Sequence, residues 1–122
     1  MILVDTSVWV DHLRVGEPRV SELLERFEVA MHPFVLGELA LGAIRARDVI
    51  LAFLRALPSA TVAEDDEVLE FISRSRLWGR GIGYVDAHLL AAVQLSPGTY
   101  LWTRDKRLRT IAGEFGVAAA IA

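Results

Sequence analysis

The sequence opens with Met1-Ile2-Leu3-Val4-Asp5-Thr6-Ser7-Val8-Trp9, and this stretch decides the fold. The segment 2–4 is a run of large apolar residues without polar alternation, which is typical of a strand buried on both faces in a parallel sheet. Asp5 follows at the carboxyl end of this predicted strand, where open α/β sheets place their ligand-binding crevice. The same acid could instead cap a helix running through Trp9. The stretch alone leaves both interpretations open.

Length and composition indicate one small domain. The chain has 122 residues, of which 53% are hydrophobic, and we expect a single domain over 1–122. Charged residues interrupt every apolar run well before bilayer length, and no basic leader with a cleavage site is recognisable. We therefore expect a cytoplasmic protein without membrane contact. A small chain with this many hydrophobic residues leaves some apolar surface uncovered, which favours an oligomer or a partner interface over a lone monomer.

The residue types available for metal binding are restricted. The chain has no cysteine and three histidines, His12, His32 and His88, at spacings that resemble no zinc motif. We expect His88 to be a structural histidine on a different helix face from its neighbour Asp86. Any metal in this protein would therefore have oxygen ligands.

The net charge of −3 hides an uneven distribution. An acidic run between Glu64 and Glu70 is interpreted as the solvated first turn of a helix. A basic group surrounds Asp105, and its contact with nucleic acid or with solvent alone stays open. Its members are Arg104, Lys106, Arg107 and Arg109.

Predicted strands and helices alternate along the rest of the chain. Apolar spacing and helix-opening prolines predict helices over 18–27, 33–42, 46–57, 65–76, 84–93 and 104–116. Short strands are predicted at 29–31, 61–62 and 100–103, with an edge strand at 117–121. The glycine-rich segment 78–83 lacks a phosphate-binding motif and is interpreted as a flexible connector. The alternation predicts a three-layer α/β/α sandwich around a central parallel sheet.

Three further acids occupy positions comparable to that of Asp5. Glu38 lies in a predicted helix that is apolar almost all round, so a buried carboxylate there must be paired, neutralised or bound to metal. An ion pair with an arginine remains an alternative for Glu38. Asp86 lies in the first turn of another apolar helix, where capping could explain it. Asp105 follows the predicted strand at 100–103.

Taken together, the four acids predict more than four separate caps. Carboxylates that converge within a few ångströms repel one another and cannot all stay ionised without compensating charge. Divalent Mg²⁺ or Mn²⁺ prefers oxygen ligands and leaves positions for water and substrate phosphate. The pattern therefore predicts a hydrolytic metal site.

Four short blocks resemble, in order, the signature blocks of PIN-domain ribonucleases, and in particular of the VapC toxins of VapBC toxin–antitoxin pairs. The blocks are Val4-Asp5-Thr6-Ser7, Pro33-Phe34-Val35-Leu36-Gly37-Glu38-Leu39, Gly83-Tyr84-Val85-Asp86-Ala87 and Thr103-Arg104-Asp105. The resemblance implies that Asp5, Glu38, Asp86 and Asp105 bind metal. It also implies that Thr103, together with Thr6, contributes hydroxyl contacts.

The resemblance further implies a Mg²⁺- or Mn²⁺-dependent endoribonuclease that hydrolyses RNA, forms a homodimer and is inhibited by a VapB-like antitoxin. Apolar stripes on the predicted helices at 19–27 and 46–57 could form a groove for a partner helix. The alternative is a PIN-domain nuclease of RNA processing or decay without a dedicated antitoxin. A phosphatase of the haloacid-dehalogenase type is excluded, because it needs an acid at the position of Ser7.

Overall fold

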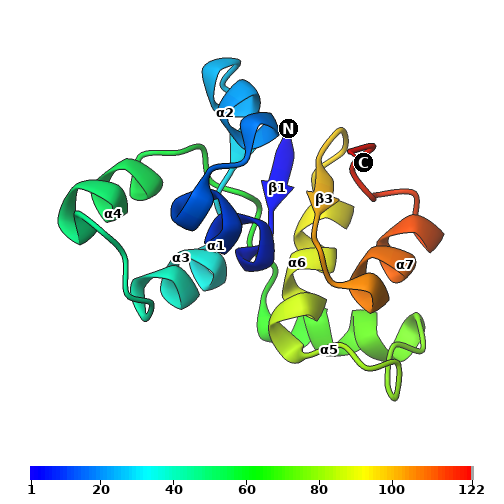
Figure 1. The fold of residues 1–122 in the computed structure, drawn as a ribbon. Helices are drawn as coiled ribbons and strands as arrows, with labels where there is room; N and C mark the ends of the chain where they lie inside the picture. The colour runs from blue at the N-terminus through cyan, green and yellow to red at the C-terminus, as the bar shows by residue number, and fades with distance from the viewer. Residues whose placement is uncertain (122) are drawn as a thin grey trace.

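A computed structural model describes residues 1–121, and its core is a parallel sheet of three strands (Figure 1). The strands are β1 (Ile2–Val4), β2 (Val29–Ala30) and β3 (Tyr100–Trp102), in the order β2-β1-β3. Leu3 of β1 is opposite Ala30 on one side and Leu101 on the other. The strand that the opening sequence predicts is therefore the central one.

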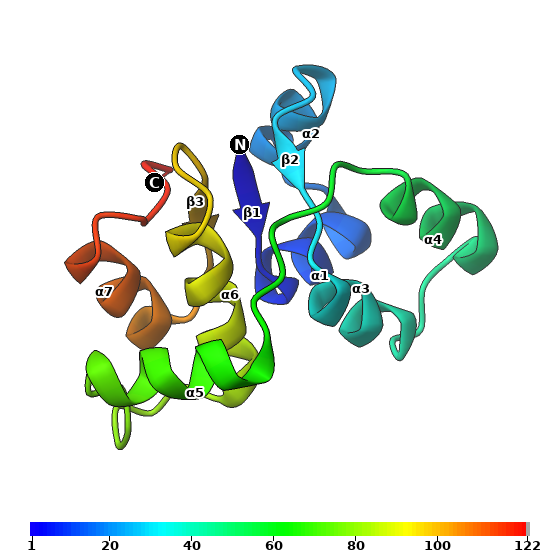
Figure 2. The same cartoon turned by 180° about the vertical axis from the view of Figure 1, so that it is seen from behind.

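Seven helices surround this sheet within residues 1–121. Figures 1 and 2, which view the molecule from opposite sides, show α1 and α6 on opposite faces of the sheet, as predicted for a layered α/β fold. None of these helices is both long enough and apolar enough to cross a membrane. The helices are α1 (Thr6–Val15), α2 (Pro18–Glu25), α3 (Pro33–Ala40), α4 (Arg47–Arg55), α5 (Asp65–Arg74), α6 (Tyr84–Gln94) and α7 (Lys106–Glu114).

Local sequence explains where these helices begin. Pro18 and Pro33 occupy first-turn positions, where the missing proline N–H costs no hydrogen bond. The side chain of Glu17 accepts from the Arg19 N–H at the start of α2, and His32 Nδ1 accepts from the Phe34 N–H at the start of α3. These caps satisfy helix N–H groups that have no partner within the helix.

Two predicted strands differ from the structure. The predicted strand at 61–62 is wrong, because the parallel bridge to Met31 forms at Ser59 instead. Met31 donates to the Pro58 carbonyl and accepts from the Ala60 N–H, so the backbone of Met31 sets the register. The edge strand predicted at 117–121 is reduced to a single parallel bridge between Leu101 and Ala118.

The core lies on both faces of the sheet and includes Val8 and Trp9 of α1 as well as the buried residues of α6. Leu3 and Val4 are fully buried, and α6 is buried along the continuous stretch 87–93. The apolar stripes of α2 and α4 are divided between the core and the surface: Val20 and Leu54 are fully buried, whereas Phe27 and Val49 are exposed. These helices therefore keep some apolar surface uncovered, but less than the sequence pattern predicts.

Candidate functional site

The acids that follow β1 and β3 lie at the same end of the sheet. Asp5 comes directly after β1 and caps α1, and Asp105 comes three residues after the last residue of β3, where it caps α7. Because β1 and β3 are adjacent and parallel, their carboxyl ends meet at one edge. Capping and site formation are thus compatible, and the two interpretations of Asp5 do not exclude each other.

Asp5 is buried in a cradle of neutral donors. Its Oδ1 accepts from the Thr6 N–H at 2.8 Å, and its Oδ2 accepts from Ser7 Oγ at 2.8 Å and from Thr103 Oγ1 at 2.7 Å. Only 7% of Asp5 and 4% of Thr103 is exposed. These bonds fix the Asp5 carboxylate without neutralising it, as the predicted hydroxyl contact of Thr103 requires.

Ser7 is a site residue that sequence reasoning did not identify. Its Oγ donates to Asp5, lies 3.5 Å from Thr103 Oγ1 and accepts from the Arg104 N–H at 3.1 Å. In the same turn, Thr103 Oγ1 accepts from the Asp105 N–H at 3.1 Å. The two hydroxyls therefore join the start of α1 to the turn between β3 and α7. The available signal was the position of Ser7 in the first signature block.

The observed partner of Glu38 is Thr6, and not the arginine considered for it from the sequence. Thr6 Oγ1 donates to Glu38 Oε1 at 2.7 Å. The inference that Glu38 is buried is wrong: Val35 and Leu39 face the core, and Glu38 lies on the exposed side of α3. Within residues 1–121, no arginine or lysine forms an ion pair with Glu38.

The pKa of Asp86 reflects the charges of the other three acids. Its Oδ2 accepts from the Gly83 N–H at 3.0 Å, so this residue also has the capping role considered for it. Burial raises the pKa of Asp86, the Gly83 bond opposes this effect, and the charges of Asp5, Asp105 and Glu38 raise the pKa further. Four elements thus bring their acids into one electrostatic field. We call Asp5, Glu38, Asp86 and Asp105 the sheet-edge acids.

The oxygen donors of the sheet-edge acids suit a hard divalent cation. They are not, however, packed around a single point: in the described part of the chain, no three His, Cys, Asp or Glu side chains are grouped closely enough to hold one metal ion. Asp5, Glu38, Asp86 and Asp105 each accept a hydrogen bond from a hydroxyl or a backbone N–H close by. The arrangement is a loose ring of acids rather than a closed cage.

Arg104 lies within the same turn but faces away from this ring. Its Nε lies 2.7 Å from Asp11 Oδ2 and its Nη2 lies 2.8 Å from Glu17 Oε2. The Arg104 guanidinium also lies over the Trp102 ring, at 5.9 Å from its centroid. The Arg19 guanidinium lies over the same ring, at 5.3 Å from its centroid. Arg104 therefore ties the turn that carries Thr103 to the connection between α1 and α2.

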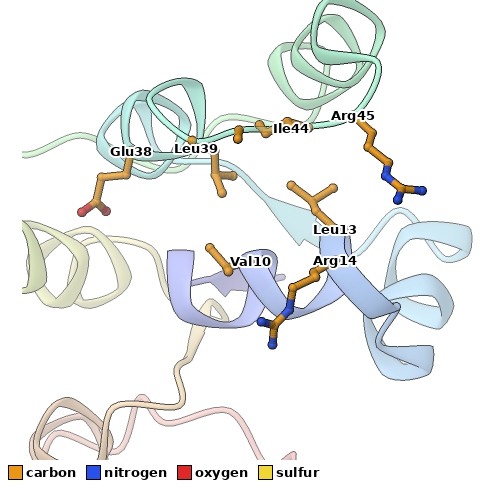
Figure 3. Close-up of a pocket in the computed structure, with 9 residues that line it drawn as sticks. Val10, Leu13, Arg14, Glu38, Leu39, Ile44 and Arg45 are labelled. Carbon is orange, nitrogen blue, oxygen red and sulfur yellow. The ribbon is translucent and has the colours of Figure 1, made fainter.

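A cavity of about 340 Å³ lies beside Glu38, between α1 and the end of α3 (Figure 3). Val10 and Leu13 supply apolar wall, while Arg14 and Arg45 place guanidinium groups at its rim. The cavity does not lie between α2 and α4, where the sequence pattern predicted a groove. It is continuous with the sheet-edge acids through Glu38.

The histidines take no part in the ring of acids. His88 is buried, with its ring centroid 4.6 Å from those of Phe34 and Tyr84, but within residues 1–121 its nitrogens make no hydrogen bond, so the expectation of a satisfied structural histidine is wrong in that respect. Its Nε2 lies 3.2 Å from Asp65 Oδ1 without hydrogen-bond alignment. His32 lies 6.3 Å from His88, and burial, followed by the charge of His88, lowers the pKa of His32 to about 4. His32 is therefore neutral at pH 7 and serves α3 as a cap.

Comparisons with known proteins agree with this architecture. The PIN domain model matches residues 2–114. Ribonuclease VapC32 from Mycobacterium tuberculosis strains CDC 1551 / Oshkosh and ATCC 25618 / H37Rv is in each case 55% identical over 120 residues, covering 98% of this chain and 97% of the relative. The crystal structure of FitAcB from Neisseria gonorrhoeae matches with a TM-score of 0.65 and 22% identity, covering 97% of this chain and 95% of that one, which shows a shared fold. The chain thus belongs to the PIN-domain family and, within it, to the VapC ribonucleases.

Proposed function

We propose that this chain is a divalent-metal-dependent endoribonuclease that hydrolyses RNA phosphodiester bonds as the toxin of a toxin–antitoxin pair. The observation that carries the proposal is the convergence of the sheet-edge acids, whose charges raise the pKa of Asp86 beyond the effect of its burial. Two relatives with 55% identity over nearly the whole chain are called ribonucleases, which supports RNA as the substrate.

In this proposal, Asp5, Glu38, Asp86 and Asp105 hold Mg²⁺ or Mn²⁺. Such an ion supplies Lewis-acid polarisation of a phosphoryl oxygen and lowers the pKa of a bound water. The hydroxyls of Ser7 and Thr103 hold the Asp5 carboxylate in a fixed orientation through their hydrogen bonds to Oδ2. Thr6 orients Glu38 in the same way from the first turn of α1.

The partner proposed for this chain is a VapB-like antitoxin, with a second copy of the chain completing a homodimer. Exposed apolar side chains on and beside α4 support an interface there, since Leu41 is 90% and Val49 is 69% exposed. The sheet-edge acids offer a second contact, because a basic side chain of the partner would meet the carboxylates of Asp5, Asp86 and Asp105 there. Purification with and without the product of the neighbouring gene, followed by mass and activity measurements, tests this partner. A monomer whose activity that product leaves unchanged would contradict it.

The test of the enzymatic proposal is metal removal. RNA cleavage by the purified chain should stop in excess EDTA and return when Mg²⁺ or Mn²⁺ is added in excess over the chelator, because the sheet-edge acids then regain their counter-charge. A variant purified in parallel, Asp86→Asn, controls for contaminating nuclease. Cleavage in EDTA that the variant preparation does not share would overturn the metal requirement.

A further inference from the structure

A second pocket lies between the loop 77–83 and the first turns of α7. It has a volume of about 210 Å³ and is lined by Arg80, Lys106, Arg107, Thr110 and Ile111. Three of these five residues are cations. The pocket is separate from the ring of acids and from the cavity beside Glu38.

Two features fix the cationic walls. Arg80 donates from both terminal nitrogens to the two carboxylate oxygens of Glu114, each at 2.7 Å, which holds its guanidinium in one place. Gly81 has φ +82°, and a side chain there would lie 2.7 Å from Arg107 Cδ and closer still to Arg107 Nη1. The backbone at Gly81 therefore lies directly on the Arg107 side chain, and a larger residue there would be strained by the positive φ and would displace Arg107.

The positive charge is placed where it does not help the fold. Lys106 and Arg107 are the first two residues of α7, at the end of a helix where the backbone dipole is positive and cations are unfavourable. The two side chains attract an anion to the pocket that they line. Within residues 1–121 the one carboxylate that is paired with a cation of this pocket is Glu114.

Each wall of the pocket is carried by a segment that also carries or contacts one of the sheet-edge acids. Lys106 directly follows Asp105, and the loop that carries Arg80 ends at Gly83, whose N–H donates to Asp86. An anion in the pocket would therefore lie beside the acids on the α7 side of the site. In Figure 1, α7 and the loop after α5 occupy the same side of the molecule.

We propose that this pocket binds a backbone phosphate of the RNA next to the bond that is cleaved; the inference rests on the proposed function and adds a subsite to it. Arg107 and Lys106 contact the phosphate, and Arg80 forms the opposite wall. The basic group around Asp105 is thereby divided. Lys106 and Arg107 are available to RNA, while Arg104 is held by Asp11 and Glu17.

The test compares two arginines of the same helix. Arg107→Gln removes a cation from the pocket, and Arg109→Gln removes an exposed cation that does not line it. Binding of a labelled single-stranded RNA, measured by fluorescence anisotropy in EDTA, should weaken about tenfold in Arg107→Gln and less than twofold in Arg109→Gln. The slope of log Kd against log salt should fall by roughly 0.7–1 in Arg107→Gln alone, as expected for one lost phosphate contact.

A third variant separates charge from misfolding. Glu114→Gln removes the negative charge that pairs with Arg80 but keeps one oxygen that accepts from its guanidinium, so RNA affinity should rise, which a damaged fold does not produce. Equal losses in Arg107→Gln and Arg109→Gln, or no gain in Glu114→Gln, would overturn the pocket. If the variants give either of these contradicting results while wild-type protein still cleaves RNA, the proposed function stands and the subsite fails. If it binds RNA through Arg107 without cleaving it, the subsite stands and the proposed function fails.

Discussion

Two groups of carboxylates lie on either side of the turn between β3 and α7, and they are stabilised in opposite ways. Asp11 and Glu17, which we call the arginine-bound acids, are paired with Arg104, and Glu17 also with Arg19. The hydrogen bonds from Arg19, and then from Arg104, lower the pKa of Glu17 to about 2. The sheet-edge acids accept their bonds from hydroxyls and backbone N–H groups instead.

The arginine-bound acids show that this fold can pair a carboxylate with an arginine side chain. Arg104 stands between Thr103 and Asp105, yet its guanidinium turns to Asp11 and Glu17. Within residues 1–121 no arginine or lysine forms an ion pair with the sheet-edge acids, and the pKa of Asp86 is raised rather than lowered. A site for an external cation requires this separation, because an internal arginine would compete with the metal.

Asp86→Asn should have the largest effect on activity. An amide keeps a carbonyl oxygen for the Gly83 N–H but brings no negative charge, so RNA cleavage should fall at least about 100-fold, more than the loss typical of outer-shell changes at metal sites. Stability without metal should stay equal or rise, because the variant removes repulsion with Asp5 and Glu38. Cleavage rates together with thermal unfolding in EDTA check both parts. A marked loss of stability would mean that the Asp86 charge supports the fold.

Arg104→Ala should have an intermediate effect, because it breaks the arginine-bound group and loosens the turn beside the ring of acids. We expect a loss of about 1–2 kcal/mol, since partly exposed ion pairs each contribute under about 1 kcal/mol and the contact with Trp102 adds to them. Activity should fall by several-fold in kcat, because the turn that carries Thr103, whose hydroxyl donates to Asp5, is then held less firmly.

Arg109→Ala is the matched control for Arg104→Ala, since Arg109 is exposed and forms no ion pair within residues 1–121. Arg104→Lys should restore little, because lysine cannot bond two carboxylates from one planar group while covering an aromatic ring. Urea unfolding and separate kcat and KM measurements provide the data. An effect confined to KM would show that Arg104 contacts RNA rather than positioning the turn.

The sequence predicted the elements that its own local pattern determines. The central strand, the proline-initiated helices and the buried α6 were confirmed because apolar runs and helix-opening residues specify them locally. The strand at 61–62 failed because bridging depends on which backbone lies opposite, and Met31 selects Ser59. The resemblance to PIN-domain ribonucleases was confirmed by the family match.

The site was predicted as a set of residue types and not as a geometry. The four acids were selected from their positions after strands and within apolar helices, but the exposure of Glu38 depends on which face of α3 packs inward. Ser7 and Arg104 were harder still, since their partners Thr103 and Glu17 are 96 and 87 residues away in the chain. Such contacts follow only from the adjacency of β1 and β3.

The smallest expected effect concerns pH and distinguishes the two groups of acids by sign. The folded pKa of Glu17 is about 2, below the ordinary value of 4.5. Its contribution to stability is therefore present above about pH 4.5 and is lost as the pH falls toward 2. Asp86 has a raised folded pKa, so its contribution has the opposite sign: it favours the fold at low pH and is lost as the pH rises through that pKa.

Urea unfolding in EDTA between pH 3 and 7 should therefore separate Glu17→Gln from Asp86→Asn. The deficit of Glu17→Gln relative to wild type should shrink as the pH falls, because wild type then loses the Glu17 ion pairs too. Asp86→Asn should gain on wild type as the pH rises, because only wild type acquires the repelled charge. Solvent around Glu17 keeps the first effect small. Parallel pH curves for all three proteins would show that the two groups of acids are not electrostatically distinct.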